Sequence, residues 1–133
     1  MIKNVTFGKY GKYSEEDCEY KLPVTVNGEE GFVTILAVNN AVHMNMNDKK
    51  VFTFSRADWH DIMNLWRDAM NNNCKIMIET EEVSMILKKT VIKNILLSYE
   101  YYTLHMISKD REKVCVDIHE DIIETIVKIG RWI

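Results

Sequence analysis

Hydrophobic and polar residues alternate along several short stretches of the first half of the chain, and this alternation predicts antiparallel β-strands. The predicted strands span residues 20–26, 32–38, 41–46 and 51–54. Pro23 cannot donate a backbone hydrogen bond, so we expect its strand at an edge of the sheet. Asn27-Gly28 favours a tight turn between the first two strands. Residues 7–20, rich in glycine and charge, predict a loop after a short first strand.

A helix is predicted directly after these strands. Ser55 is a suitable N-cap, with Asp58 at the third helical position. The residues that follow place an apolar stripe on one face, at helical spacing. The stripe consists of Trp59, Ile62, Met63, Trp66 and Met70. We expect the helix to end at the asparagines 71–73.

The second half repeats the order of strands followed by a helix. Strands are predicted over residues 74–80, 83–89, 91–98, 99–107 and 114–116. Asp117 is then expected to cap a final helix, with Glu120 at its third position. Its apolar positions are Ile118, Ile122, Ile126 and Ile129. Gly130 stands where such a helix would end.

The sequence therefore predicts an α+β fold, in which an antiparallel sheet is covered by two amphipathic helices. A chain of 133 residues fits a single domain over 1–133. Two pseudo-repeats, at about 20–73 and 74–133, suggest an internal duplication of a strands-then-helix unit. The aligned pairs are 35–36 with 95–96, 43–44 with 105–106, and 61–63 with 121–123. Two unrelated units of the same kind would share this periodicity, which is the alternative to duplication.

Charge and composition limit the kinds of partner and the cellular compartment that we expect. The net charge is −3, with acidic and basic residues interspersed, so we do not expect nucleic acid as the main partner. No apolar stretch approaches the length of a membrane span, and no signal peptide is visible at the N-terminus. Three cysteines, none in a CxxC pair, favour free thiols in a reducing compartment. We therefore expect a cytoplasmic protein that does not bind membranes.

No motif predicts catalysis, a cofactor or a metal. The four histidines lack the local spacing of a zinc site, and no phosphate-binding loop or dinucleotide turn is present. Cys74 and Cys115 are expected in strands, buried and unreactive. The paired carboxylates lie in predicted turns and at a helix start, where water solvates them. We therefore predict no catalytic residue, no cofactor, no metal ligand and no enzymatic activity.

The strongest functional feature is a row of tyrosines near residue 100. The outward positions of the predicted strand are Tyr99, Tyr101, Thr103, His105 and Ile107, whereas its counterpart in the first half carries His43 and Asn45. Tyrosine concentrates at interfaces, so we expect Tyr99, Tyr101 and His105 to contact a partner. Arg56 and Arg67, on the polar face of the first helix, are further candidates. The alternative is that another segment of the chain covers these rings.

These observations favour a non-catalytic protein-binding module that acts by steric occlusion of a larger target. Its composition, rich in lysine, asparagine and isoleucine, is typical of AT-rich genomes. A phage or mobile-element inhibitor of a bacterial defence system, or a toxin-immunity protein, is the form expected. One alternative is a small-molecule or nucleotide binder, with a tyrosine-lined pocket and a converging Arg or Lys. Another is an enzyme of unrecognised chemistry. Unpaired strand edges and the isoleucine-rich last helix also suggest a homodimer.

Overall fold

The computed structural model describes residues 4–6, 11–14 and 18–130. Three short strands form a small antiparallel sheet near the N-terminus: β1 (Asn4–Thr6), β2 (Gly11–Ser14) and β3 (Cys18–Tyr20). The loop predicted over residues 7–20 is therefore wrong, because β2 pairs with β1 on one side and β3 on the other. The prediction for residues 7–10 and 15–17 lies outside the described residues.

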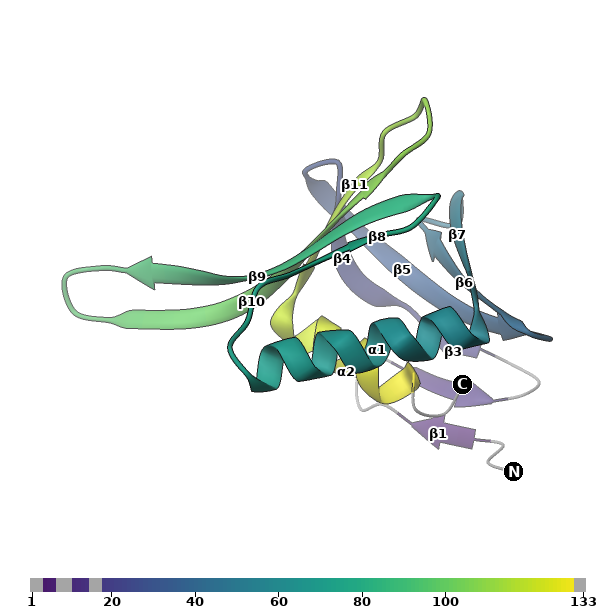
Figure 1. The fold of residues 1–133 in the computed structure, drawn as a ribbon, viewed down its shortest axis with the longest axis horizontal. Helices are drawn as coiled ribbons and strands as arrows, with labels where there is room; N and C mark the ends of the chain where they lie inside the picture. Colours follow the sequence, from purple (N-terminus) through teal and green to yellow (C-terminus); the bar gives the residue numbers. More distant parts are fainter. Residues whose placement is uncertain (1–3, 7–10, 15–17, 131–133) are drawn as a thin grey trace.

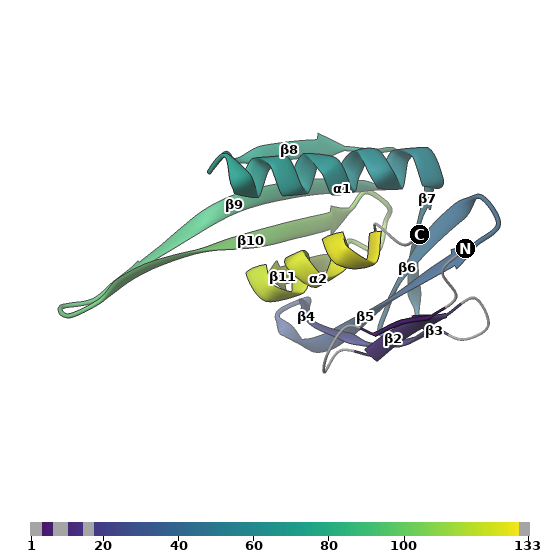
Figure 2. The same ribbon diagram turned by 90° about the horizontal axis from the view of Figure 1, so that it is seen from below.

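An antiparallel sheet of eight strands forms the main part of the fold, in the order β7-β6-β5-β4-β11-β10-β9-β8. The sheet curls around two helices that lie together on its inner face (Figures 1 and 2). This agrees with the predicted α+β class. The strands are β4 (Leu22–Val26), β5 (Glu29–Val38), β6 (Ala41–Met46), β7 (Lys50–Ser55), β8 (Ile76–Glu79), β9 (Val83–Lys93), β10 (Ser98–Ser108) and β11 (Cys115–His119). The helices are α1 (Arg56–Asn71) and α2 (Glu120–Gly130).

Helix α1 begins where the sequence predicts it. The Ser55 hydroxyl accepts a hydrogen bond of 3.1 Å from the backbone N–H of Asp58, as an N-cap does. The predicted apolar stripe faces the core, since Trp59, Ile62, Met63 and Trp66 are buried and Met70 is half-buried. The helix connects β7 and β8, which are the two edge strands of the main sheet.

Helix α2 begins later than predicted. Asp117 does not cap it, because residues 115–119 continue as β11 and Asp117 pairs with His105 across the sheet. Ile118 accordingly faces the core from a strand, and the helix itself starts at Glu120. Alternating apolar residues at 114, 116 and 118 favour an extended chain once β10 and β4 are available on either side.

The segment around residue 95 departs most from the prediction. No strand spans 91–98, because β9 runs on to Lys93 and β10 starts at Ser98. Between them, the Asn94 carboxamide oxygen accepts hydrogen bonds from the backbone N–H groups of Leu96 (3.0 Å) and Leu97 (2.7 Å). These bonds turn the chain back on itself. The proposed alignment of residues 35–36 with 95–96 is therefore wrong, since the first pair lies in β5 and the second in a turn.

Pro23 lies in an interior strand, contrary to the prediction of an edge. Strand β4 is flanked by β5 and β11, but its register with β11 covers only Thr25 and Val26. On the other side Pro23 faces Phe32, whose backbone N–H and C=O both bond to Asn47 of the β6–β7 turn and not to β4. Pro23 therefore belongs to a non-hydrogen-bonded pair between β4 and β5. Its backbone nitrogen, which has no hydrogen to donate, faces β11 at a point where that strand has already diverged from β4.

The strands follow one order across the whole sheet: β8 to β11, and then β4 to β7. His43 and His105 occupy the third strand of each set, β6 and β10. Internal duplication itself stays a prediction. Alternate residues of the main-sheet strands share one hydrophobic core with the buried faces of the helices; the fully buried members include Leu22, Val33, Ile35, Val42, Met44, Met85, Leu87, Leu104 and Met106. Neither described helix has the length and apolar character needed to cross a membrane.

Candidate protein-binding surface

The distal halves of β9 and β10 project from the body as a two-stranded arm, which we define as residues 88–103 (Figures 1 and 2). Its ladder is continuous from Lys88–Thr103 to Lys93–Ser98. The residues on the body side of this point, such as Leu87 and Leu104, are buried under the helices. Beyond it most side chains are exposed apart from Tyr102, which is buried at the arm root, so the outer part of the arm is a ribbon with solvent on both faces.

The tip of the arm exposes three consecutive aliphatic side chains. Their relative exposures are 101% for Ile95, 89% for Leu96 and 65% for Leu97. A single exposed leucine needs no explanation, but a contiguous apolar group at the end of a projection is typical of an interaction site. The tip was not predicted from the sequence, because an aliphatic run over residues 91–98 is typical of a strand. Asn94, which forms the turn through its side chain, was the available signal.

Two of the predicted contact residues lie on one face of the arm. Tyr99 is 53% exposed and stacks on the half-buried Tyr101, with ring centroids 6.2 Å apart. Tyr101 in turn stacks on His119 of β11 at 4.7 Å and an interplanar angle of 22°. The aromatic row therefore runs from the arm onto the outer face of the main sheet. His119 was not among the predicted contact residues, because its place beside Tyr101 depends on the β10–β11 register.

The root of the arm is tied to the C-terminal end of α1. The Lys89 ammonium lies 2.7 Å from a Glu100 carboxylate oxygen and donates a hydrogen bond of 3.0 Å to the Asn73 side chain. The hydrogen bond to Glu100 is the main reason why the pKa of Lys89 is raised. The Tyr102 hydroxyl is 3.4 Å from the Met70 carbonyl oxygen. A cation at a helix C-terminus is also favoured by the helix dipole, so this cluster fixes the direction of the arm.

His105, the third predicted contact residue, lies nearer the centre of the outer face. Its Nδ1 is 2.5 Å from an Asp117 carboxylate oxygen, and the two side chains are 30% and 45% exposed. The pair holds the imidazole in a fixed orientation. Within the described part of the chain, no group of three or more histidine, cysteine or carboxylate side chains is placed to hold a metal ion.

A cleft of about 540 Å³ opens beside this pair, where β4 and β11 diverge. Tyr101 and His119 line one side, and Glu30 lies on the opposite strand pair. The small-molecule alternative predicts a converging Arg or Lys in a tyrosine-lined pocket. The described residues lining this cleft include neither, and they do include the acidic Glu30, Asp117 and Asp121. Such a lining would repel the phosphates of a nucleotide.

The two predicted arginines lie on α1, apart from the tyrosine row. Arg56 is the first residue of the helix, at the end opposite the arm root (Figure 1). Its Nε donates a 2.6 Å hydrogen bond to the Asn39 carbonyl, which holds the β5–β6 turn against the helix start. Arg67 is half-buried, with its Nε 3.6 Å from the carboxylate of the adjacent Asp68. The structure does not bring Arg56 together with the tyrosines.

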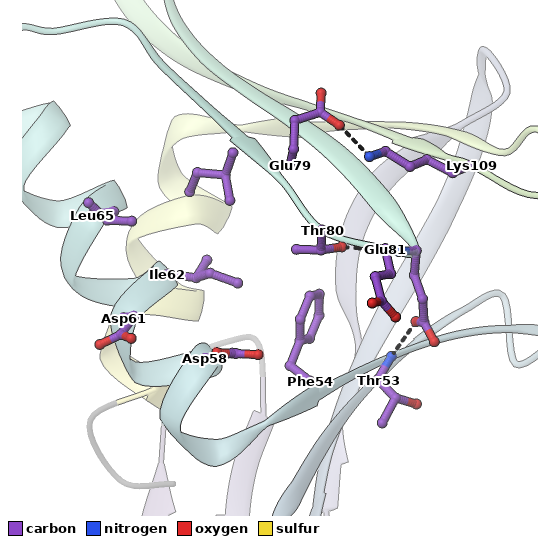
Figure 3. Close-up of a pocket in the computed structure, with 12 residues that line it drawn as sticks. Thr53, Phe54, Asp58, Asp61, Ile62, Leu65, Glu79, Thr80, Glu81 and Lys109 are labelled. Carbon is purple, nitrogen blue, oxygen red and sulfur yellow. Dashed lines mark hydrogen bonds and ion pairs between the residues drawn. The ribbon is translucent and has the colours of Figure 1, made fainter.

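A larger groove, of about 740 Å³, lies between the first turns of α1, strand β7 and the β8–β9 turn (Figure 3). The backbone N–H of Thr53 donates a 3.0 Å hydrogen bond to the Glu82 carboxylate and so bridges the two edges of the main sheet. Glu79 forms an ion pair with Lys109, at the top of the view in Figure 3. The hydrogen bond from Lys109 is the main cause that lowers the pKa of Glu79, with a second from Ser84.

The cysteines are not equivalent. Cys74 is exposed, contrary to prediction, because it precedes β8 in the turn after α1, where its thiol is 3.4 Å from the Asn72 carbonyl oxygen. Cys115 is half-buried in β11. Comparisons of the chain with protein-family models, with curated proteins and with solved structures found no match.

Proposed function

We propose that this chain is a non-catalytic protein-binding module that docks its projecting arm into a recess of a larger protein and blocks that protein sterically. The observation that carries the proposal is the arm tip, where Ile95, Leu96 and Leu97 are held in solvent by a hydrogen-bonded turn. An exposed apolar group of this kind lowers the solubility of the free chain. Its burial against a partner supplies a favourable free energy instead.

The binding free energy available from burial of the arm tip is large for so small a contact. Complete burial of a leucine or isoleucine side chain contributes roughly 1.5–3 kcal/mol. Three such side chains therefore offer about 4.5–9 kcal/mol before the costs of association are subtracted. This is the character of a hot spot, in which a few central residues supply most of the binding free energy.

The tyrosine row extends the same surface. Tyr99 and Tyr101 lie directly behind the tip on one face of the arm, and their stacking holds both rings in place before a partner arrives. Preorganised rings lose little conformational entropy on binding. Tyr99, Tyr101 and His105 are thus proposed as flanking contacts, with the tip as the anchor. Arg56 and Arg67, which lie on α1, are assigned no part in this surface.

The forms of target to test first are a bacterial defence nuclease and a toxin, for which the chain would serve as a phage-borne inhibitor or an immunity protein. A rigid arm is suited to both, because a ribbon inserted in a recess prevents access of substrate without any chemistry. The acidic lining of the β4–β11 cleft favours this class of function over nucleotide binding.

The test is affinity capture from a lysate of the source cells with three baits: the wild-type chain, a tip variant with Ile95→Ser, Leu96→Ser and Leu97→Ser, and a control with Met77→Ser. Met77 is 61% exposed on β8, outside the arm, so its replacement removes a comparable apolar side chain elsewhere. We expect a protein that is retained by the wild type and the control and is lost from the tip variant. Equal retention of every captured protein by the tip variant would refute the proposal.

A further inference from the structure

The groove between α1, β7 and the β8–β9 turn combines an apolar floor with an acidic rim. Its apolar lining residues are Phe54, Ile62 and Ile78, which we call the floor, and Leu65, which is 43% exposed. Phe54, Ile62 and Leu65 are labelled in Figure 3. The acidic rim consists of four carboxylates that also line the groove, those of Asp58, Asp61, Glu81 and Glu82. Lys109 is the one basic side chain among the described lining residues, and Glu79 pairs with it. The groove therefore has a negative field around an apolar centre.

The arm tip has the complementary character. Its first aliphatic residue, Ile95, lies two positions after Lys93, whose ladder partner is the neutral Ser98. Lys88 adds a second positive charge at the arm root. The acid of the arm, Glu100, is already paired with Lys89. The arm thus presents an apolar end with a net positive charge, which matches an apolar floor with a negative rim.

The two surfaces lie at opposite ends of the molecule. The arm extends beyond the C-terminal end of α1, whereas the groove lies at the first turns of that helix and at the sheet edges (Figures 1 and 2). The arm root is fixed by the Lys89–Glu100–Asn73 cluster, so the tip is not free to fold back on its own groove. A contact between the two surfaces must join separate molecules.

We propose that the arm tip of one copy docks in the acidic-rimmed groove of a second copy, head to tail. The inference rests on the proposed role of the tip as a docking element, and it names copies of this chain as one partner of that tip. Such a contact is heterologous, because different surfaces meet, and it leaves one tip and one groove open at the ends of every chain of molecules. Self-association would keep the apolar tips covered until a target competes for them.

Sedimentation of the full chain over a wide concentration range tests the assembly. A contact limited to one tip and one groove is smaller than a standard interface, so we expect weak association with a dissociation constant in the micromolar range or above. Raising the salt from about 0.1 M to about 1 M should weaken it by roughly two- to fivefold, because screening removes the charge attraction. A wild-type chain that stays monomeric at millimolar concentration overturns the inference.

Complementary variants distinguish this arrangement from any symmetric dimer. Leu96→Asp disables the tip, and Leu65→Lys disables the groove by placing a cation opposite Lys93. Both positions are exposed, so the monomers should keep the wild-type melting temperature. Each variant alone should associate at least tenfold more weakly than the wild type. Mixed together they should form a 1:1 complex that grows no further, because one intact tip meets one intact groove.

Other outcomes are equally informative. A mixture that stays monomeric, or a tip variant that associates as well as the wild type, overturns the head-to-tail contact. Wild-type binding to vesicles of anionic and neutral lipid, lost in Leu96→Asp without any self-association, assigns the tip to a lipid surface and also overturns it. A monomeric wild type that captures a different protein through its tip overturns the self-association and leaves the proposed function standing.

Discussion

Leu96 and Leu104 lie on the same hairpin, and replacing each by alanine removes the same atoms from opposite environments. Leu104 is fully buried on the inner face of β10, whereas Leu96 is 89% exposed at the arm tip. Leu104→Ala loses the transfer free energy of its side chain and leaves a cavity under the helices, at a cost of about 2–5 kcal/mol. Leu96→Ala loses no packing in the isolated chain and should change stability by less than about 0.5 kcal/mol.

The assay is urea and thermal unfolding followed by circular dichroism at low protein concentration, where self-association is minimal. For a chain of this size about 1 kcal/mol corresponds to a few degrees, so Leu104→Ala should lower the melting temperature by roughly 8–20 °C and Leu96→Ala by about 2 °C at most. A loss of more than about 1.5 kcal/mol in Leu96→Ala would refute the reasoning. It would mean that the tip packs against the chain itself and is not free for a partner.

Three further outcomes follow from contacts in the body of the fold. An alanine Cβ at Gly130 would lie 2.5 Å from Met63 Cγ, so Gly130→Ala should cost roughly 1–3 kcal/mol in urea unfolding, and clearly less in a Met63→Ala background. Lys109 lowers the pKa of Glu79 in the folded state. At pH values above the ordinary glutamate pKa, the ionised carboxylate therefore stabilises the fold, and this stabilisation is lost as the pH falls through the lowered pKa. Glu79→Gln should therefore destabilise at about pH 7, and the difference from the wild type should shrink as the pH falls through the lowered pKa; a difference that does not change with pH would contradict the ion pair. Lys89→Met should speed amide exchange in the arm while leaving the global melting temperature within about 2 °C, and unchanged exchange would show that Lys89 does not hold the arm root.

Local sequence signals account for α1 and for the β8–β9 hairpin that follows it in the chain. Ser55 and Asp58 lie three residues apart, so the cap is formed within one turn and needs no distant partner. The β8–β9 turn is likewise local, with the Thr80 N–H bonded to the Val83 carbonyl at 2.9 Å. The period of two along β10 correctly placed Tyr99, Tyr101 and His105 on one face, since alternation is a property of any strand. Whether that face contacts a partner stays a prediction.

Long-range pairing decided the features that the sequence left open. Asp117 has the chemistry of a helix cap, but the strands on both sides of residues 115–119 offer more hydrogen bonds than a cap does, and the helix starts after them. Pro23 is tolerated inside the sheet because β11 diverges from β4 at that point. Neither neighbour is close in sequence, so neither outcome could be read from the local pattern.

The sequence by itself determined the α+β class, the start of α1 and the tyrosine alternation, because each depends on side-chain periodicity or on a cap within a few residues. Only the tertiary structure decided that residues 94–97 are a turn in solvent, that His119 continues the tyrosine row, and that an acidic groove lies between the two sheet edges. The physical reason is the same in each case. A run of aliphatic residues has the same sequence pattern whether it is buried in a strand or exposed at a turn. Which of the two occurs is set by strands and helices that are distant in sequence.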